Sequence, residues 1–501
     1  MSKKKILIFV VAYNAEKTIT DVLKRIELDP QAFDIEILVI DDASDDATFE
    51  HALESAKAFA VYKITILRNR VNQGYGGNQK LGYQYAINHN YDVVVLLHGD
   101  GQYAPEIIGD LIKPVIENKA DAVFGSRMLI KGGARKGGMP LYKYVGNKIL
   151  TNIQNLLLNT RLSEFHSGYR VYSTRALKRL PFEFNSNDFH FDTQIIIQLI
   201  AGNMRITELP IPTYYGDEIC YVSGMKYAWN VLMSTFAYGF HRMGIFYQFH
   251  YDVEPEGTAY SPKIDYLSPH SAAITLVKEN STVFDIGCGP FSDIADILTQ
   301  KKSCRVYALE YTRPQNMENL VEFFERDLDA DELPEPVSGA DYVLLLDVLE
   351  HLKRPEEFLL HLREKCNLHA HVLISVPNVA FFPVRLMLLL GRFNYGRAGI
   401  LDKTHTRLFT YSSFRKILKQ SGFVVNKIRG IPAPFEKALG KKGLAKILLN
   451  FNRFLIFIKK RMFAYQFFAE VQRLPVVQDI LKETLETSKQ RIAAAKRKKN
   501  E

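Results

Sequence analysis

Residues 93–102 read VVVLLHGDGQ, and the earlier stretch 37–48 reads ILVIDDASDDAT. In both stretches a run of apolar residues ends abruptly in acidic, glycine or small polar residues. The second half of the chain repeats this form at 283–289, which reads VFDIGCG. Such runs are typical of buried strands in a parallel sheet, which presents ligand-binding groups at the carboxyl ends of its strands. The sequence therefore predicts two α/β folds in series, each with its own ligand site.

Length and composition agree with two globular domains. The chain has 501 residues, of which 47% are hydrophobic and 24% charged. That is too long for one ordinary core and is typical of folded proteins. The net charge of +9 fits nucleotide ligands or an anionic surface, and it fits a merely solvated basic face equally well.

Cysteine usage and hydropathy indicate the compartment. The four cysteines are scattered without paired spacing, so neither a disulfide framework nor a zinc site is expected. The start, MSKKKILIFVVAYN, resembles a signal peptide, but no small-residue cleavage site follows, and we expect the first buried strand there. No stretch reaches the roughly 18 apolar residues of a spanning helix. We expect a cytoplasmic protein, with peripheral attachment at the inner face of the membrane as a further option.

Alternating strand and helix patterns divide the chain into parts. Residues 1–245 predict a first domain with trailing helices, 246–265 an acidic linker with prolines and glycine, 266–432 a second domain, and 433–501 a basic amphipathic helical region. The strands of the first domain are predicted near 5–12, 36–41, 63–67, 92–98 and 121–124. Those of the second are predicted near 282–286, 305–309, 341–346, 371–376 and 422–428.

Polar side chains follow two strands of the first half. Asp41 and Asp42 end one strand, where carboxylates can accept hydrogen bonds from the base and ribose of a nucleotide. Asp100 follows another strand, and Gln102 lies two residues further on. Their oxygens suit a divalent ion, Mg²⁺ or Mn²⁺, that bridges a diphosphate. The sequence NQGYGGN at 72–78 predicts a glycine-rich turn. Because glycine has no side chain, the backbone of such a turn can approach a ligand closely.

These motifs, in this order, resemble a known family. The runs are VVAYNAEKTI (10–19), VIDDASDDAT (39–48), NQGYGGNQK (72–80), HGDGQYAPE (98–106) and FHSGYR (165–170). Over residues 5 to about 215 the chain resembles family 2 glycosyltransferases of GT-A fold, and among them the polyprenyl-phosphate mannosyl- and glucosyltransferases. The resemblance implies a Rossmann-like N-terminal domain that binds a nucleotide sugar.

The resemblance also implies roles for individual residues. It implies nucleotide-sugar contacts from Tyr13, Glu16, Asp41, Asp42, Asp100 and Arg127, with Arg127 holding phosphate charge. Catalytic roles near the acceptor fall on Arg170 and Asp192, and metal ligation on Asp100 and Gln102. At the first acidic position of the family's metal motif this chain has His98. Its imidazole can ligate Mn²⁺ or orient a metal-bound water but carries less negative charge, so weaker metal dependence is expected.

The second half carries a different constellation. The glycine turn after Asp285 contains Gly287 and Gly289, and Glu310 ends the next predicted strand, where it can take both ribose hydroxyls. Asp327 follows at a position suited to an adenine amino group. Pro290 removes a backbone donor from the turn, which argues against a dinucleotide site.

This half resembles a class I S-adenosylmethionine-dependent methyltransferase over residues 266 to about 428. Supporting runs are ADYVLLLDVLEHLKRPEEFL (340–359), VLISVPNVAFF (372–382) and LDKTHTRLFT (401–410). The resemblance implies a second Rossmann-like domain that binds S-adenosylmethionine through Asp285, Gly287, Gly289, Glu310, Asp327 and Asp347. Methylation of a sugar hydroxyl needs a base, for which His351 and His405 are the candidates.

The two halves together predict a bifunctional transferase. We expect glycosyl transfer from a UDP- or GDP-linked sugar to a lipid-phosphate or glycan acceptor. We also expect methylation, as O-methylation of a sugar, in cell-surface glycan or glycolipid biosynthesis. The alternative is that only one half is catalytically active and the other serves as a ligand-binding or scaffolding module; His98 makes the first half the weaker one.

The C-terminal region predicts a partner. Residues 437–468 carry eight basic residues among seven aromatic ones. At helical spacing, lysine and arginine could reach anionic headgroups while aromatic rings enter the membrane interface. The alternative is a helix packed on the second domain, with its basic residues solvated. No nucleic-acid partner is expected, because no aromatic RNA-binding motif accompanies the basic tail.

Overall fold

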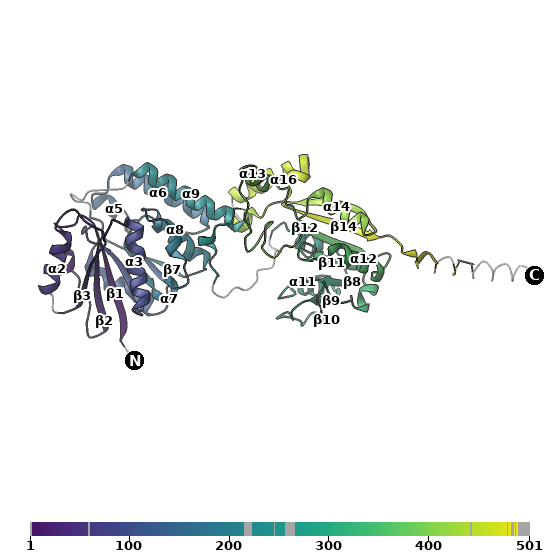
Figure 1. Cartoon of the computed structure of the whole chain (residues 1–501), viewed down its shortest axis with the longest axis horizontal. Helices are drawn as coiled ribbons and strands as arrows, with labels where there is room; N and C mark the ends of the chain where they lie inside the picture. Colours follow the sequence, from purple (N-terminus) through teal and green to yellow (C-terminus); the bar gives the residue numbers. More distant parts are fainter. Residues whose placement is uncertain are drawn as a thin grey trace, which may run out of the picture. The chain divides into compact units, whose positions relative to one another are not determined.

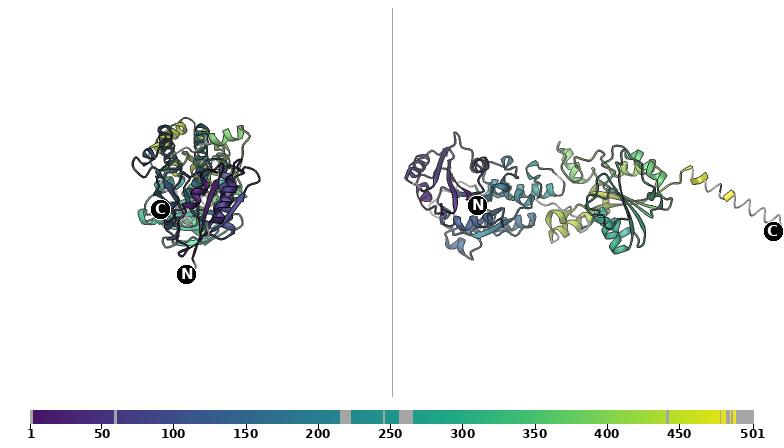
Figure 2. Two further views of the ribbon diagram at one scale, coloured as in Figure 1. Left: turned by 90° about the vertical axis from the view of Figure 1, so that its left-hand side faces the viewer. Right: turned by 90° about the horizontal axis from the view of Figure 1, so that it is seen from below.

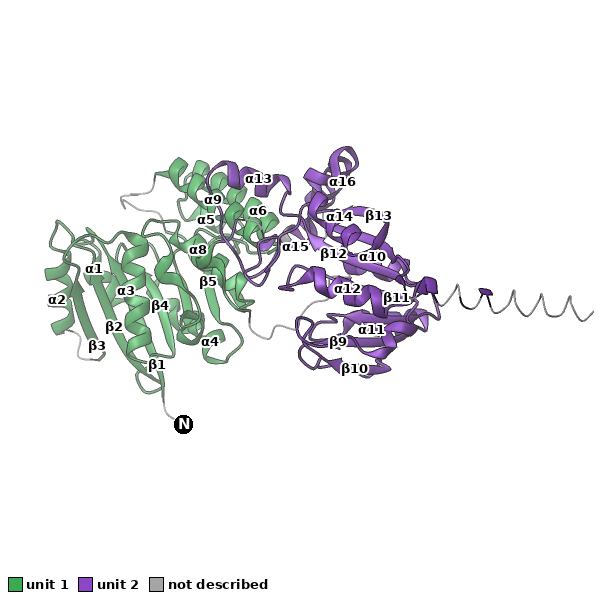
Figure 3. Ribbon diagram, turned by 45° about the vertical axis from the view of Figure 1, so that its right-hand side comes forward, with its two compact units in different colours: residues 1–241, 248–258 green, residues 242–247, 259–501 purple. Residues whose placement is uncertain are grey.

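A computed structural model describes residues 3–58, 61–214, 223–244, 246–255, 266–440, 443–477, 479–481, 485, 487 and 488. The chain divides into two compact units, coloured separately in Figure 3. Unit 1 comprises residues 1–241 and 248–258, and unit 2 comprises 242–247 and 259–501. Each unit is an α/β fold built on one sheet, as the sequence predicts.

Unit 1 is built on a seven-stranded sheet of order β3-β2-β1-β4-β6-β5-β7. β6 runs antiparallel to its neighbours β4 and β5, and the other pairs are parallel. The strands are β1 (Lys4–Ala12), β2 (Phe33–Asp41), β3 (Lys63–Arg68), β4 (Val93–His98), β5 (Ala122–Ser126), β6 (Arg170–Ser173) and β7 (Ile206–Pro210). The sequence predicts the first five and misses the short β6 and β7.

Helices cover both faces of this sheet (Figures 1 and 2). They are α1 (Ile19–Lys24), α2 (Thr48–Ala58), α3 (Tyr75–Asn88), α4 (Ile108–Ile116), α5 (Gly133–Lys136), α6 (Leu141–Leu158), α7 (Thr174–Leu177), α8 (Phe191–Ala201) and α9 (Gly224–Arg242). Short 3₁₀ turns are η1 (Pro105–Ile107), η2 (Phe182–Phe184) and η3 (Phe249–Tyr251).

The alternation of side chains along β1 explains this layering. Ile6 and Ile8 enter a core with residues of α1 and α4, whereas Leu7 and Phe9 enter a second core with residues of α3 and α8. Because successive side chains point to opposite faces, a strand buried on both faces is apolar throughout. The register aligns Ala12 with Asp41 and places His98 beside β1. The polar residues that end β2 and β4 therefore lie at the same edge of the sheet.

Unit 2 has a second seven-stranded sheet, of order β10-β9-β8-β11-β12-β14-β13. Only β14 is antiparallel to its neighbours, β12 and β13. The strands are β8 (Thr282–Ile286), β9 (Arg305–Glu310), β10 (Glu322–Glu325), β11 (Tyr342–Leu346), β12 (His371–Pro377), β13 (Phe423–Ile431) and β14 (Gln466–Arg473). Five of these are predicted from the sequence; β10 and β14 are not.

Most helices of unit 2 pack on the two faces of its sheet against two apolar clusters, and two of them pack against a third cluster that contains Phe381 and Ile400. The helices are α10 (Pro269–Leu276), α11 (Asp293–Lys302), α12 (Pro355–Lys365), α13 (Phe382–Leu389), α14 (Tyr411–Gln420), α15 (Phe435–Leu439) and α16 (Leu444–Phe463), with the 3₁₀ turn η4 (Glu335–Gly339). Within the described residues, no helix combines the length and apolar character needed to cross a membrane.

β14 corrects the prediction that residues 433–501 are a helical tail. The strand inserts between β12 and β13 and pairs with both. Phe467 and Val471 enter the core on one face of the sheet, while Phe468 enters the core on the other. Because both faces are buried, the run QFFAEVQR lacks the polar–apolar alternation that identifies a strand. The second fold therefore extends to Arg473.

The stretch between the two folds also differs from the predicted linker at 246–265. Residues 242–247 belong to unit 2, where Met243 and Phe246 pack against Phe381 and Val384. Residues 248–255 return to unit 1, where Tyr251 and Val253 are buried in its core. The described part of the stretch is therefore packed, and 256–265 lie outside the described residues.

Candidate functional sites

The carboxyl end of β2 places two buried carboxylates at the sheet edge of unit 1. Asp41 accepts hydrogen bonds from the backbone and hydroxyl of Ser44. Asp42 accepts from the Asn69 side chain at 2.7 Å and from the Gln73 backbone N–H at 2.8 Å. Asp42 thereby fixes the start of the glycine-rich turn that precedes α3.

A chain of polar contacts runs along the same edge from Asp100 to Asp192. Asp100 Oδ2 lies 3.9 Å from His98 Nδ1, and His98 Nε2 lies 3.2 Å from the Tyr75 hydroxyl. That hydroxyl donates to Asp192 Oδ2 at 3.1 Å. Burial favours a raised pKa for Asp100, but His98 and the backbone N–H of Gln102 outweigh it and hold the pKa below its usual value. Asp100 is thus ionised, as a metal ligand must be.

Asp192 and Arg170 form the buried end of this chain. Asp192 is 6% exposed and Arg170 is 1% exposed. Asp192 also accepts from Gln79 Nε2 at 3.1 Å, and Arg170 Nη2 lies 3.8 Å from Asp192 Oδ2. Arg170 donates to the carbonyls of Ser167 and Phe165. Asp192 therefore holds a buried cation next to the strand-end site.

Arg127, by contrast, has its partners inside the protein. Its guanidinium is paired with the buried carboxylate of Glu164 and donates to the carbonyl of His166 at 2.9 Å. Asn147 donates to the same carboxylate. Arg127 thus already has partners within the protein, and its assignment to donor phosphate stays a prediction.

The remaining predicted residues of this site lie on its accessible side. Tyr13 is 39% exposed just beyond β1. Glu16 accepts a hydrogen bond from the backbone of Ala47 at 3.2 Å, which ties the start of α1 to the turn before α2. Gln102 is partly exposed, and its backbone N–H donates to Asp100 at 3.0 Å.

The sequence motifs include Tyr75 and Gly168 but assign neither residue a role of its own. Tyr75 joins His98 to Asp192 although its contact with Asp192 spans 117 positions. Gly168 lies against His98: a Cβ there would come within 2.5 Å of His98 Nε2, so only glycine lets the imidazole take this place. The NQGYGG turn and the HSGYR run were the available signals, but neither showed that the two meet at His98.

Unit 2 presents its candidate site at the carboxyl ends of β8, β9 and β11. Glu310 accepts from the backbone N–H groups of Gly289 at 2.9 Å and Tyr311 at 2.8 Å. Gly287 and Gly289 have φ of 78° and 72°, which side chains rarely adopt. A Cβ on Gly287 would also lie 2.5 Å from a methyl of Val348.

Asp285 lies beneath this turn with 1% exposure. Burial, followed by the charge of Glu310, raises the pKa of Asp285 to about 7. Among the described residues, no group hydrogen-bonds to Asp285 Oδ2. A buried carboxylate oxygen in this state is suited to a ligand that brings its own donor.

Asp327 and Asp347 lie at the same sheet edge as Glu310. Arg326, just before Asp327, donates its backbone N–H to the Glu310 carbonyl at 3.1 Å. Asp347 follows β11 with φ of 60° and accepts from Ser375 at 2.6 Å and Gln466 at 2.9 Å. Gln466 comes from β14, so the strand that the sequence did not predict contributes to this site.

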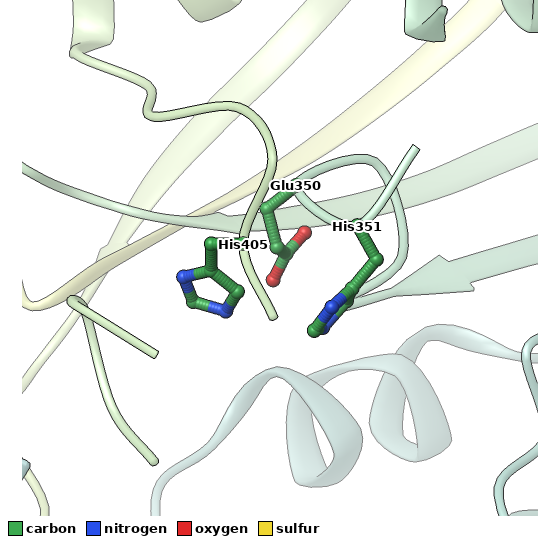
Figure 4. A group of neighbouring side chains, drawn as sticks. All are labelled: Glu350, His351 and His405. Carbon is green, nitrogen blue, oxygen red and sulfur yellow. The ribbon is translucent and has the colours of Figure 1, made fainter. Parts of the chain in front are cut away.

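Both predicted bases, His351 and His405, lie in loops near β11. Their ring centroids are 4.9 Å apart, and a carboxylate oxygen of Glu350 lies within 4.8 Å of a nitrogen of each ring (Figure 4). Burial lowers the pKa of His405, although its bond to the Ile400 carbonyl opposes this shift. His405 is therefore neutral at neutral pH.

Comparison with known proteins agrees with this division. The family model "Glycosyl transferase family 2" matches residues 7–180, and the model "Methyltransferase domain" matches residues 256–428. Unit 1 is similar to the UDP-N-acetylglucosamine–dolichyl-phosphate N-acetylglucosaminyltransferase of Methanococcus voltae. The two are 30% identical over 227 residues, which cover 43% of this chain and 88% of that protein.

Two further comparisons involve mycobacterial proteins. The polyprenol monophosphomannose synthase of Mycolicibacterium smegmatis is 26% identical over 41% of this chain and 76% of its own length. A crystal structure of glucosyl-3-phosphoglycerate synthase from Mycobacterium tuberculosis with Mn²⁺, UDP and phosphoglyceric acid is 16% identical. It covers 47% of this chain and 78% of its own, with a TM-score of 0.36. The chain belongs, through unit 1, to the family 2 glycosyltransferases, and its unit 2 is a methyltransferase domain.

Proposed function

We propose that unit 1 transfers a sugar from a UDP- or GDP-linked donor to a lipid-phosphate acceptor, and that unit 2 uses S-adenosylmethionine to methylate an oxygen of a sugar. The polar chain from Asp100 through His98 and Tyr75 to Asp192, set at the sheet edge beside Asp42, carries the first part. The relatives named for dolichyl and polyprenol phosphate acceptors support the lipid acceptor. Synthesis of a cell-surface glycan or glycolipid would use both reactions.

The donor nucleotide would lie against Asp41, Asp42, Tyr13 and Glu16, where the ends of β1 and β2 adjoin. Asp42 is already engaged with Asn69 and the Gln73 backbone, so a base or ribose would meet a carboxylate held in a fixed position. Preorganisation of this kind reduces the entropy lost on binding.

A divalent ion, Mg²⁺ or Mn²⁺, would lie between Asp100, His98 and Gln102. The donor set fits: Asp100 has a lowered pKa and His98 directs Nδ1 toward it. Such an ion would neutralise the charge of the departing nucleoside diphosphate. The protein itself would hold the carboxylate ionised and fix the imidazole through Tyr75.

The acceptor chemistry assigns different roles to Asp192 and Arg170. A phosphate acceptor is already ionised at neutral pH and needs no general base, so Asp192 would serve by holding Arg170 and Tyr75 in place. Nη1 of Arg170 is buried without a hydrogen-bond partner among the described residues. The charge of this buried guanidinium would complement the acceptor phosphate. A glycan hydroxyl would instead require Asp192 as base.

In unit 2 the methyl donor would take its place on Asp285, Glu310 and Asp327, with Asp347 at its methionine end. Glu310 would accept the ribose hydroxyls, and Asp285 Oδ2 would accept from the amino group of the ligand. S-adenosylmethionine supplies a methyl group on a sulfonium, and the residues around it would align the acceptor oxygen with that methyl.

Exposed apolar side chains support a membrane surface as partner. On α9, Met225, Trp229, Met233 and Phe236 are 86%, 65%, 48% and 45% exposed, and their spacing places them on one helix face. On α16, Phe457 is 89% exposed. Phe467 and Phe468 are instead buried in the sheet of unit 2, and residues 441 and 442 lie outside the described residues. The proposed location is thus cytoplasmic and peripheral, at the inner face of the membrane.

Thermal unfolding of the full chain with a panel of UDP- and GDP-sugars and Mn²⁺ tests the donor. We expect one donor to raise the melting temperature, because a ligand that binds only the native state stabilises it. Radiolabelled transfer from that donor to polyprenyl phosphate in detergent would follow. If no nucleotide sugar stabilises the protein or serves as donor, the proposed glycosyl transfer is refuted.

A further inference from the structure

Glu350, His351 and His405 bring three ligand-type side chains together in unit 2. Their ligating atoms all lie within 4.8 Å of one another, as the close-up in Figure 4 shows for the three labelled side chains. Within the described ranges this is the one group of three histidine, cysteine or acidic side chains arranged so closely. Glu350 is buried, His405 half-buried and His351 exposed, so the group opens outward on one side.

Both imidazoles are oriented through Nδ1. His405 Nδ1 lies 3.0 Å from the Ile400 carbonyl, and a carbonyl can only accept, so Nδ1 carries the proton. His351 Nδ1 lies 3.1 Å from the Thr404 hydroxyl, which itself donates to Asp402 at 2.7 Å. Nδ1 of His351 is therefore also the donor. In both neutral rings the lone pair remains on Nε2, as is usual for metal-ligating histidines whose other nitrogen is hydrogen-bonded.

Backbone bonds hold the two loops against each other. The N–H groups of Thr406 and Arg407 donate to the Glu350 carbonyl at 2.8 and 3.0 Å. The Thr406 hydroxyl donates to the Leu352 carbonyl at 2.6 Å. The loop that carries His405 is thus fixed to the turn that carries Glu350 and His351, so the three side chains are preorganised.

One carboxylate and two imidazoles form a donor set with a clear metal preference. Imidazole favours transition-metal ions such as Fe²⁺, Co²⁺ or Zn²⁺ over Ca²⁺ and Mg²⁺. Bonds of about 2.1 Å to each ligand require donor atoms roughly 3–4 Å apart. The observed limit of 4.8 Å needs only a small rotation, which the exposed His351 can make. Three protein ligands leave coordination positions open for substrate.

We propose that Glu350, His351 and His405 bind a divalent transition-metal ion whose open positions take the hydroxyl oxygen of the methyl acceptor. The binding of the methyl acceptor by this metal rests on the proposed methyl transfer, whereas the metal site itself does not. Asp347, three residues before Glu350, follows β11 at the candidate donor site, so an acceptor held by the metal would lie next to the methyl donor. An acceptor with two neighbouring hydroxyls, as in a sugar, could occupy two open positions.

The reaction balances without a further co-reactant. Metal coordination lowers the pKa of the acceptor hydroxyl, and its proton passes to water. The oxygen forms a bond to the methyl carbon while the carbon–sulfur bond breaks, and that electron pair stays on sulfur. The products are a methyl ether and a neutral thioether. In this scheme His351 and His405 are metal ligands and not the bases that the sequence suggests.

Cobalt binding to the full chain tests the site. The parent protein should carry Asp100→Asn, which removes the proposed ion of unit 1, and should be stripped with EDTA before Co²⁺ is added. We expect one equivalent of Co²⁺ with visible d–d absorption. His351→Ala and His405→Ala should each weaken this binding by about 10-fold or more, and His369→Ala, an exposed histidine of the same unit, should not.

The readouts separate the possible failures. His351→Ala changes an exposed side chain, and retained binding of S-adenosylmethionine by calorimetry would show that the variants are folded. Equal Co²⁺ affinity in the parent and in both histidine variants would overturn the metal site. Co²⁺ binding that depends on the two histidines, in a chain that binds no S-adenosylmethionine, would support the metal site and refute the proposed methyl transfer instead.

Discussion

The hydroxyl of Tyr75 links His98, beside Asp100, to the buried ion pair of Asp192 and Arg170. It contacts His98 Nε2 at 3.2 Å and Asp192 Oδ2 at 3.1 Å. Tyr75→Phe keeps the ring and removes both contacts. We expect the unfolding free energy to fall by about 1–3 kcal/mol and glycosyl transfer to fall by roughly 10- to 100-fold, measured as initial rates on folded protein.

A matched control for this prediction is Tyr85→Phe. Tyr85 also donates to a buried carboxylate, Glu36 Oε1 at 2.6 Å, at a distance from the strand-end site. The Tyr85→Phe variant should lose a similar amount of unfolding free energy and keep the parental rate of glycosyl transfer. Equal transfer rates for Tyr75→Phe and the parent would show that the polar chain has no role in the reaction.

Asp285 gives unit 2 a pH dependence with a definite sign. Its pKa is about 7 in the folded state against a usual value of 3.8, so between these pH values the folded state binds more protons than the unfolded state. The contribution of Asp285 to the free energy of unfolding is therefore largest below about pH 4, and it declines as the pH rises to about 7. Asp285→Asn cannot ionise, so its melting temperature relative to the parent should be higher at about pH 8 than at about pH 5.

The measurement is the melting transition that S-adenosylmethionine shifts in the parent, followed in full-length protein at both pH values. Asp293→Asn serves as comparison: its pKa is also raised by burial, but it lies on α11 and not in the glycine turn. If the difference in melting temperature between Asp285→Asn and the parent is the same at both pH values, the prediction is contradicted.

At the scale of elements, the predictable strands are those with long apolar runs. β1, β2, β4 and β8 each contain an unbroken run of buried residues, and this made both their position and the position of Asp42, Asp100 and Asp285 predictable. β14 follows the helix α16 directly and has Gln and Glu among its aromatic residues, so only its two neighbours in the sheet define it. The role of Tyr75 was not predictable for a similar reason, because its partner Asp192 lies on a helix far away in the sequence.

The truncation of the chain tests the place of β14. Removal of residues 482–501 should leave the melting temperature of unit 2 unchanged, because it keeps Asp479, which pairs with Arg473. Removal of 464–501 takes away a strand that pairs on both edges and should abolish cooperative unfolding of unit 2 and its binding of S-adenosylmethionine. A shorter chain that still binds this ligand with parental affinity, by calorimetry, would show that β14 is dispensable.

At the scale of the whole molecule, the two candidate sites have no residue in common. Asp100→Asn should abolish metal-dependent glycosyl transfer and leave S-adenosylmethionine binding unchanged. Glu310→Ala should weaken that binding about 10-fold or more, since a hydrogen bond to a charged group contributes about 1.5–3 kcal/mol, and should leave glycosyl transfer intact. Two results would favour the alternative in which one half is a binding module. In one, each variant keeps the activity of its own unit; in the other, only one unit of the parent protein is active.

Membrane attachment is also a property of the whole chain, measured by flotation with liposomes of anionic or neutral lipid. Met225→Ser and Trp229→Ser together remove the two most exposed apolar side chains of the α9 face and should reduce the floated fraction severalfold. Leu53→Ser, at an exposed leucine of α2, should float like the parent. Equal flotation of all three proteins would exclude α9 as a membrane contact.

The path of the chain at residues 242–247 has a consequence for any exchange of parts. The hydroxyl of Tyr465 donates to the Met243 carbonyl at 2.8 Å, and Gly244 lies so close to Gly399 that a Cβ would approach its Cα to 2.6 Å. The chain then goes back into unit 1 before it enters unit 2 for good. A chimera with a single crossover after residue 247 would therefore receive a methyltransferase unit that lacks its own residues 242–247, which complete one of its apolar clusters. A working chimera that keeps both cores needs three junctions, after residues 241, 247 and 258, so that residues 242–247 stay with unit 2 and residues 248–258 stay with unit 1.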